Sequence, residues 1–199
     1  MSPRPRTIND SDIFAATLEA AGEFGPTKLT LAHVAKKVGM SPATLIQRFG
    51  TKKGLLLAAL SQGGGGSGDP FRAVREKHAS PLEALLVILT ECSSMFAVSP
   101  EVLANHLAFL QMDLTDPDFY ALTLAQAQAT HDGIRALLEE SVAANELAAG
   151  DTERLARAVH DVYTGAVLNW AVFRDGSVED RVLQGLATLL SPLRAIRKR

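Results

Sequence analysis

The stretch VGMSPATLIQRFGTKK, residues 38–53, places a glycine and a Ser-Pro pair between two apolar segments. Before the glycine, apolar residues recur at helical spacing: Leu31, Val34, Ala35 and Val38. Gly39 stands where a left-handed helix cap belongs. The Ser41 hydroxyl can then accept a bond from a free amide of a new helix, and Pro42 needs no amide bond at the first helical position. The stretch therefore predicts two short helices that meet at a corner.

Two further helices flank this corner. Apolar residues at helical spacing in the segment 11–24 predict the first, and Gly25-Pro26 predicts its end. The second is expected to begin near Thr51. Its apolar side consists of Leu55, Leu56, Ala59 and Leu60.

The composition predicts a soluble, cytoplasmic protein. The chain has 199 residues and a single cysteine, Cys92, which excludes an internal disulfide and fits a reducing compartment. Residues 1–12 lack the apolar core of a signal peptide, and no apolar run is long enough to span a bilayer.

Charge is unevenly distributed along the chain. Residues 1–55 contain eight Lys and Arg against four Asp and Glu, a net charge of +4, whereas the whole chain carries −2 and the remainder therefore −6. A basic N-terminal part on an acidic body indicates a polyanionic partner for that part alone. Chance clustering on a solvated surface would give the same charge count.

The rest of the chain predicts an all-α fold. The segment 61–70, SQGGGGSGDP, is too rich in glycine for a stable helix and indicates a flexible boundary between domains. We expect a helix-turn-helix DNA-binding domain in residues 1–60 and a helical effector-binding and dimerisation domain in residues 71–199. The helices expected there span 81–98, 100–112, 117–148, 151–175 and 178–197, the first three of which begin at a proline.

The corner is suited to reading DNA. A helix-turn-helix sets its second helix in the major groove, where small residues permit close approach and polar residues contact base edges or phosphates. The outward residues of the second helix, with its cap, fit this requirement: Ser41, Pro42, Ala43, Thr44, Gln47 and Arg48. Thr30 and Lys52, at the starts of the neighbouring helices, are placed for phosphate contacts. An ordinary helical corner in an all-α protein is the alternative interpretation.

The segment LTLAHVAKKVGMSPATLIQRFGTKKGLL, preceded by IFAATLEAAGEFGPTK, resembles the DNA-binding domain of the tetracycline-repressor (TetR) family of transcriptional regulators. The resemblance implies a homodimer that binds a near-palindromic operator and is released by a small molecule. It also assigns the recognition role to Pro42, Ala43, Thr44, Gln47 and Arg48, and phosphate contacts to Thr30 and Lys52. The family usually has an aromatic residue after the Thr-Leu pair, where this chain has Ile46.

The last two predicted helices are apolar on more than one side, which fits an isologous four-helix interface between two subunits. The alternative is that they only cover the core of their own chain. An effector pocket is expected among the larger residues of the preceding helices, and the low charge there favours an apolar or aromatic effector. The candidate ligand-binding residues are Phe96, His106, Phe109, Leu110, Phe119, Tyr120, His131 and Trp170.

Other kinds of site find little support. The segment 113–119, DLTDPDF, lacks the glycine and distal glutamate of a calcium loop and is interpreted as a turn and helix cap. Cys92 is expected to pack in a helix rather than to sense oxidants. No metal, cofactor or catalytic residue is predicted. Two functions remain: a ligand-responsive repressor, and a helical small-molecule-binding or interaction protein without sequence-specific DNA binding.

Overall fold

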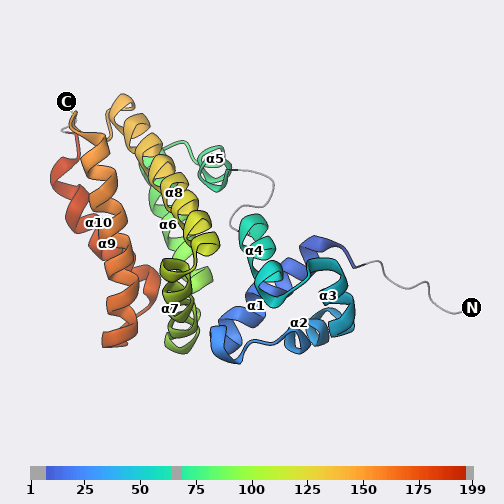
Figure 1. Cartoon of the computed structure of the whole chain (residues 1–199). Helices are drawn as coiled ribbons and strands as arrows, with labels where there is room; N and C mark the ends of the chain where they lie inside the picture. Colours follow the sequence, from blue (N-terminus) through green and yellow to red (C-terminus); the bar gives the residue numbers. More distant parts are fainter. Residues whose placement is uncertain (1–7, 64–68, 196–199) are drawn as a thin grey trace, which may run out of the picture. The chain divides into compact units, whose positions relative to one another are not determined.

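The computed structural model of the chain describes residues 8–63 and 69–195, apart from the side chain of Phe96. Within these residues the fold is all-α, as predicted, and contains no strand. The helices (Figure 1) are α1 (Asp10–Lys28), α2 (Leu31–Val38), α3 (Pro42–Phe49), α4 (Lys52–Gly63), α5 (Pro70–Arg75), α6 (Pro81–Phe96), α7 (Pro100–Thr115), α8 (Pro117–Ala143), α9 (Thr152–Phe173), α10 (Val178–Leu190) and the short 3-10 helix η1 (Ser191–Leu193).

The chain divides into two compact units whose boundaries cross two helices. Unit 1 combines residues 1–67 with residues 104–123, and unit 2 combines residues 68–103 with residues 124–199. The second half of α7 and the start of α8 thus pack with the N-terminal helices, although the sequence analysis assigned them to the C-terminal domain. Helical periodicity identifies the apolar side of a helix but not the core that will bury it.

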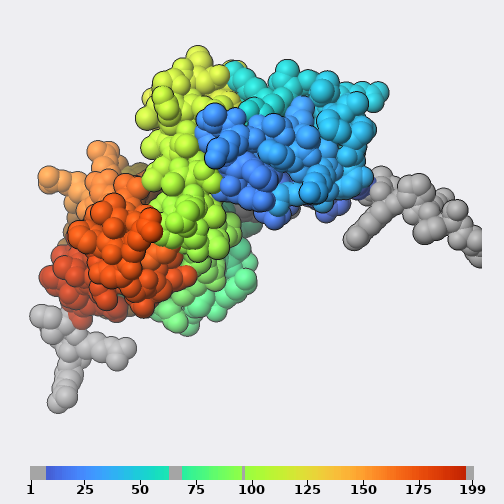
Figure 2. Space-filling model, turned by 90° about the horizontal axis from the view of Figure 1, so that it is seen from below, coloured from blue at the N-terminus to red at the C-terminus, as the bar shows by residue number. Residues whose placement is uncertain are grey.

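The core of unit 1 is built by helices from both of its chain segments. Ile13, Leu45 and Phe119 are completely buried there, and Phe109 of α7 lies in the same cluster. In Figure 2 the lime-green atoms around residues 104–123 lie against the blue atoms of α1. The side-chain amide of Asn105 adds a polar link, because it donates to the backbone oxygens of Gly22 at 2.8 Å and of Glu23 at 3.0 Å.

The regular helical backbone of α1 breaks at Gly25-Pro26, where the sequence predicted the end of the first helix, and α1 as a whole runs on to Lys28 across this kink. Gly25 interrupts the helical backbone with φ of 67°, and the chain resumes a helical course as far as Lys28. The positive φ and the Asn105 side chain, which would lie 2.7 Å from an added Cβ, explain why glycine occupies this position. The break redirects the chain into the turn before α2.

Unit 2 has its own core, formed by α5, α6, α9, α10, the start of α7 and the later part of α8. The short helix α5, which the sequence analysis missed, packs Phe71 directly over Gly133 of α8. A Cβ at position 133 would lie 2.5 Å from the Phe71 ring, so the contact requires glycine. Trp170 is nearly buried in this core and donates its indole N–H to the Gly176 oxygen at 3.2 Å.

Helix starts were predicted better than helix ends. Pro81, Pro100 and Pro117 each begin a helix, as expected. Helix α8 ends at Ala143 instead of 148, because Asn145 adopts φ of 56° and the amide of Ala148 bonds the Leu193 oxygen. Helix α10 ends at Leu190, and residues 196 and 197 of the predicted helix lie outside the described residues.

Part of the predicted Gly-rich boundary also lies outside the described residues, since these omit 64–68. Its first residues, 61–63, continue α4, and α5 begins at its last residue, Pro70. Among the described helices, no single one is long and apolar enough to span a membrane, although α6 and α7 together meet the criterion by length and composition.

Removal of the Phe119 ring should destabilise the protein far more than removal of the neighbouring aromatic ring. Phe119 is 0% exposed and Tyr120 is 49% exposed, although both lie in the first turns of α8. Phe119→Ala should cost about 3–5 kcal/mol of unfolding free energy, and Tyr120→Ala less than about 1 kcal/mol. Urea unfolding measures both values. Equal losses would show that Phe119 does not complete the core of unit 1.

Candidate nucleic-acid interface

Local backbone chemistry builds the corner between α2 and α3, as predicted. Thr30 caps α2 by accepting from the amide of His33 at 3.3 Å, and the His33 ring accepts from the Thr30 amide at 3.4 Å. Gly39 ends α2 in the left-handed conformation, with φ of 70° and ψ of 33°. Ser41 then caps α3 by accepting from the amide of Thr44 at 3.1 Å, directly before Pro42.

The inward face of α3 fixes the helix on unit 1. Leu45 is completely buried, and the Phe49 ring lies 5.7 Å from the Phe14 ring of α1, measured between centroids. A helix of eight residues is not stable alone, so these contacts hold α3 in place.

The outward face of α3 is exposed at every predicted recognition position: Pro42, Ala43, Thr44, Gln47 and Arg48. The hydroxyls of Ser41 and Thr44 lie 2.8 Å apart and share a hydrogen bond. Gln47 bonds to no other group in the described part of the chain, so both its amide oxygen and its amide nitrogen are available to an incoming base edge. The corner thus presents a small residue, a hydroxyl pair and a free amide on one surface.

Arg48 is exposed but already has partners. One guanidinium nitrogen lies 2.7 Å from a carboxylate oxygen of Asp10, and the other donates to the Ile8 backbone oxygen at 3.4 Å. Sequence reasoning did not find these partners, because Asp10 begins α1 and Ile8 precedes it, some 40 residues earlier in the chain. The Asp10 carboxylate therefore competes with a base or a phosphate for Arg48.

Lys52 also forms hydrogen bonds within unit 1. Its ammonium donates to the backbone oxygens of Pro26 and Leu29, both at 3.1 Å, and so clamps the turn between α1 and α2. An ammonium has three N–H groups, and these two bonds leave the third for a phosphate. Thr30 is exposed, and its hydroxyl proton stays available because its oxygen only accepts in the capping box.

Two further lysines of unit 1 are neutralised by acids. Lys37 lies 2.7 Å from Glu19 and 2.9 Å from Glu23, and the hydrogen bonds to these carboxylates raise the pKa of Lys37. Lys53 lies 2.7 Å from Asp116 and 2.8 Å from Asp118, which raises the pKa of Lys53 and lowers that of Asp116.

The positive charge is therefore local rather than spread over the whole unit. Residues 104–123 carry three Asp and no Lys or Arg, so they lower the net charge of unit 1 from +4 to +1. The segment DLTDPDF acts as a turn and helix cap, as predicted, since Asp116 accepts from the amide of Asp118 at 3.0 Å. Its carboxylates also pair with Lys53.

The predicted ligand-binding residues are divided between the two units. Phe109 and Phe119 lie in the core of unit 1, Trp170 lies in the core of unit 2, and the side chain of Phe96 is outside the described residues. Leu110 and Tyr120 are exposed, at 43% and 49%, and His106 is partly buried. Within its own unit, each of these large residues lies in a core, is partly buried or is exposed.

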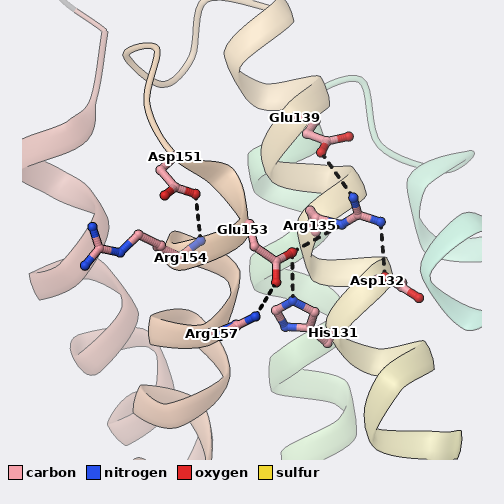
Figure 3. Close-up of polar contacts among 8 residues, drawn as sticks. All are labelled: His131, Asp132, Arg135, Glu139, Asp151, Glu153, Arg154 and Arg157. Carbon is pink, nitrogen blue, oxygen red and sulfur yellow. Dashed lines mark hydrogen bonds and ion pairs between the residues drawn. The ribbon is translucent and has the colours of Figure 1, made fainter.

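His131 lies in a polar cluster between α8 and α9 of unit 2 (Figure 3). Its Nε2 atom is 3.2 Å from Glu153, without hydrogen-bond geometry, and Arg157 lies 2.8 Å from the same carboxylate. These partners, Arg157 first, lower the pKa of Glu153, and burial lowers the pKa of the nearby His160.

A hollow of about 510 Å³ adjoins this cluster. It is lined by Ala127, Gln128, His131, Asp132 and His160. Apart from His131, the polar residues there were missed by the sequence analysis, although Gln128, His131 and Asp132 share one face of a helix by their spacing. The lining is polar, in contrast to the apolar pocket expected from the sequence.

A second hollow of about 390 Å³ lies between α9 and α10. Its walls are Val162, Gly165, Ala166, Asn169, Arg181, Gln184, Gly185 and Thr188. The same two helices expose Leu168, Val172, Phe173 and Leu183. Their opposite sides are buried in the core of unit 2, so each helix has one face for its own chain and a second, partly apolar face that is open.

Cys92 has the environment of a packing residue. Burial raises the pKa of its thiol, which disfavours the reactive thiolate. Among the described residues, no three His, Cys, Asp or Glu side chains are grouped in a way that could hold a metal ion.

The comparisons with known proteins agree with the fold and the corner. Residues 13–59 match the family model described as bacterial regulatory proteins, tetR family. The HTH-type transcriptional regulator BetI 1 of Chromohalobacter salexigens is 30% identical over 116 residues, which cover 58% of this chain and 57% of that protein. BetI of Rhizobium meliloti is 30% identical over 94 residues, covering 47% and 46%. The chain thus spans about half the length of the curated relatives it matches.

Solved structures match over nearly the whole chain. A TetR transcription regulator from Haloarcula marismortui has a TM-score of 0.73 at 18% identity, over 93% of this chain and 97% of that one. The regulator FadR of Bacillus subtilis, solved with stearoyl-CoA, has a TM-score of 0.68 at 17% identity, over 92% and 98%. At such identities the likeness shows the fold.

The resemblance to the TetR family is therefore confirmed, and residues 13–59 form a helix-turn-helix domain of that family. The relatives are named as transcriptional regulators, in agreement with the prediction of a protein that is not an enzyme.

Removal of the Asp10 carboxylate should strengthen DNA binding, because it frees Arg48 from its partner. An exposed ion pair is worth up to about 1 kcal/mol, so Asp10→Asn should tighten binding by up to about fivefold. Asp12→Asn is the matched control: it removes the same charge from the same helical turn, but Asp12 has no ion pair in the described part of the chain. Fluorescence anisotropy on one duplex measures both affinities. Equal gains in affinity for the two variants would mean that net charge, and not the pairing of Asp10 with Arg48, controls DNA binding.

Proposed function

We propose that this chain, with its TetR-family helix-turn-helix domain, is a transcriptional regulator that binds a near-palindromic operator as a homodimer. We further propose that it acts as a repressor and that a small-molecule effector releases it. The observation that carries the proposal is the exposed face of α3, which carries hydrogen-bonding groups. The buried Leu45 on the opposite face holds the helix on unit 1. A cytoplasmic location follows from this role.

The chemistry of α3 supports base reading rather than charge attraction alone. The small Ala43 allows the helix backbone to approach base edges, and the free amide of Gln47 matches the donor and acceptor pair of adenine in the major groove. Thr30, Lys52 and Arg48 surround this surface with groups that can bind phosphates. Such contacts would set the register of the protein on the duplex while α3 reads the sequence.

The open face of α9 and α10 supports a two-fold dimer. Gly165 and Gly185 line its hollow, and small residues allow helices of a second copy to approach closely. The exposed Leu168, Val172, Phe173 and Leu183 would lose contact with water in such an interface. A dimer would present two copies of α3, which matches the symmetry of a near-palindromic operator.

The hollow beside His131 is the best-supported effector site. Its imidazoles, amide and carboxylate favour a ligand with hydrogen-bonding groups, which differs from the apolar effector expected from the sequence. The FadR of Bacillus subtilis was solved with stearoyl-CoA, so a chain of this fold can hold a ligand that is apolar at one end and polar at the other. We propose a ligand with at least one polar group for the hollow.

Sequence-specific binding can be tested by selection from random duplex DNA, followed by anisotropy on the selected site. Gln47→Ala should weaken binding to that site by about 1–3 kcal/mol and binding to scrambled DNA much less, because only base reading depends on sequence. Gln62→Ala, an equal change at an exposed position of α4, should leave both affinities unchanged. Failure to enrich any sequence would favour the alternative, a helical binding protein that does not read DNA.

Gly165→Arg should convert the dimer into monomers. The space beside Gly165 is open, with no atom within 4 Å of an added Cβ, so the fold of one chain should tolerate the change, whereas a closely packed second copy should not. Gly150→Arg is the control, since that glycine also has open space and lies outside α9 and α10. Light scattering measures the mass in solution. A monomeric wild-type protein at micromolar concentration would contradict the dimer.

A further inference from the structure

Ile46 is an exposed apolar side chain on a helix that otherwise presents polar or small groups. It is 51% exposed, and among the described residues 8–63 no other large hydrophobic side chain is exposed to this extent. Its neighbour Leu45 is completely buried, so Ile46 does not contribute to holding α3 on unit 1 in the way Leu45 does. A branched side chain is also restricted in its rotamers, which keeps this apolar surface in a defined position.

The spacing of residues on α3 divides its exposed surface into two flanks. Ile46 and Ala43 are three positions apart and share one flank, whereas Thr44 and Arg48 are four apart and share the other. Gln47 lies between the two flanks. The recognition helix therefore has an apolar side and a polar side, with the amide of Gln47 in the middle.

The major groove has one apolar group among the four standard bases. Guanine, cytosine and adenine present hydrogen-bond donors and acceptors there, and thymine adds its C5-methyl group. An isoleucine side chain can neither donate nor accept a hydrogen bond, so a polar base edge or a phosphate would lose hydration against it without compensation. The thymine methyl group is the base feature that gains from contact with Ile46.

We infer that Ile46 determines specificity by contacting a thymine methyl group next to the base pair that Gln47 reads. This inference rests on the proposed function and adds a base identity to it: each half-site of the operator contains a thymine whose methyl group packs on the Ile46 and Ala43 flank. The contact involves apolar surface alone, so it should be insensitive to salt, unlike the phosphate contacts around it.

The test replaces thymine by uracil, which removes the methyl group and leaves the pairing unchanged. In the selected operator, each thymine is replaced in turn, in both half-sites together. Loss of one buried methyl group costs roughly a factor of four, so with both half-sites changed the wild-type protein should lose about sixteenfold in affinity at one symmetric position. At that position Ile46→Ala should bind the thymine and uracil duplexes equally, while Ile46→Val, which keeps a branched apolar side chain, should still prefer thymine.

Each outcome is decisive. If the selection enriches no operator, the proposed function itself is contradicted. A selected operator with no position at which the wild-type protein distinguishes thymine from uracil overturns the role of Ile46 and leaves the function intact. The same holds if Ile46→Ala loses affinity but keeps the thymine preference, since Ile46 would then pack on the sugar or support the fold. If Ile46→Ala does not fold, Ile46→Val and Ile46→Thr are compared instead. Threonine carries a hydroxyl group where valine carries a second methyl group, so this pair provides the same comparison of apolar surface.

Discussion

Burial of Phe119 in the core of unit 1 is the contact on which the DNA-reading surface depends. Helices α2 and α3 have eight residues each and are too short to be stable alone, so both rely on a core that they help to build. That core is completed by Phe109 and Phe119, which arrive from α7 and α8. The core on which α3 packs thus includes residues sixty or more positions later in the chain.

This arrangement links residues 104–123 to the helices that position α3. Asn105 holds the end of α1, Lys53 joins α4 to Asp116 and Asp118, and Leu56 of α4 lies in the same core as Phe119. The raised pKa of Lys53 and the lowered pKa of Asp116 keep this pair charged from mildly acidic to mildly alkaline pH; it weakens below the ordinary range of an aspartate and above that of a lysine. A shift of residues 104–123 would therefore change the contacts of the helices that position α3.

The sequence predicted what local chemistry decides. The cap at Ser41, the left-handed Gly39 and the proline helix starts all depend on residues within a few positions of each other. By contrast, the partners of Arg48 and Lys52 lie 40 and more than 20 residues away, and no periodicity reveals them. The burial of Phe109 and Phe119 was hidden for the same reason: a phenylalanine suits a pocket and a core equally well, and only the packing of α7 and α8 places these two in the core of unit 1.

The internal partners of the basic residues have a consequence for how DNA would be chosen. In unit 1, Arg48 is paired with Asp10, Lys37 with two glutamates and Lys53 with two aspartates, so these acids compete with phosphates for the cations. Attraction to arbitrary DNA comes almost entirely from phosphate neutralisation, and it is weakened by this competition. The uncharged side chains on α3 give up no ion pair when they contact a base edge; these are Thr44, Ile46 and Gln47. Pairing of these cations with acids of unit 1 therefore lowers non-specific affinity more than specific affinity. The ratio between the two affinities decides occupancy of an operator among many competing sites.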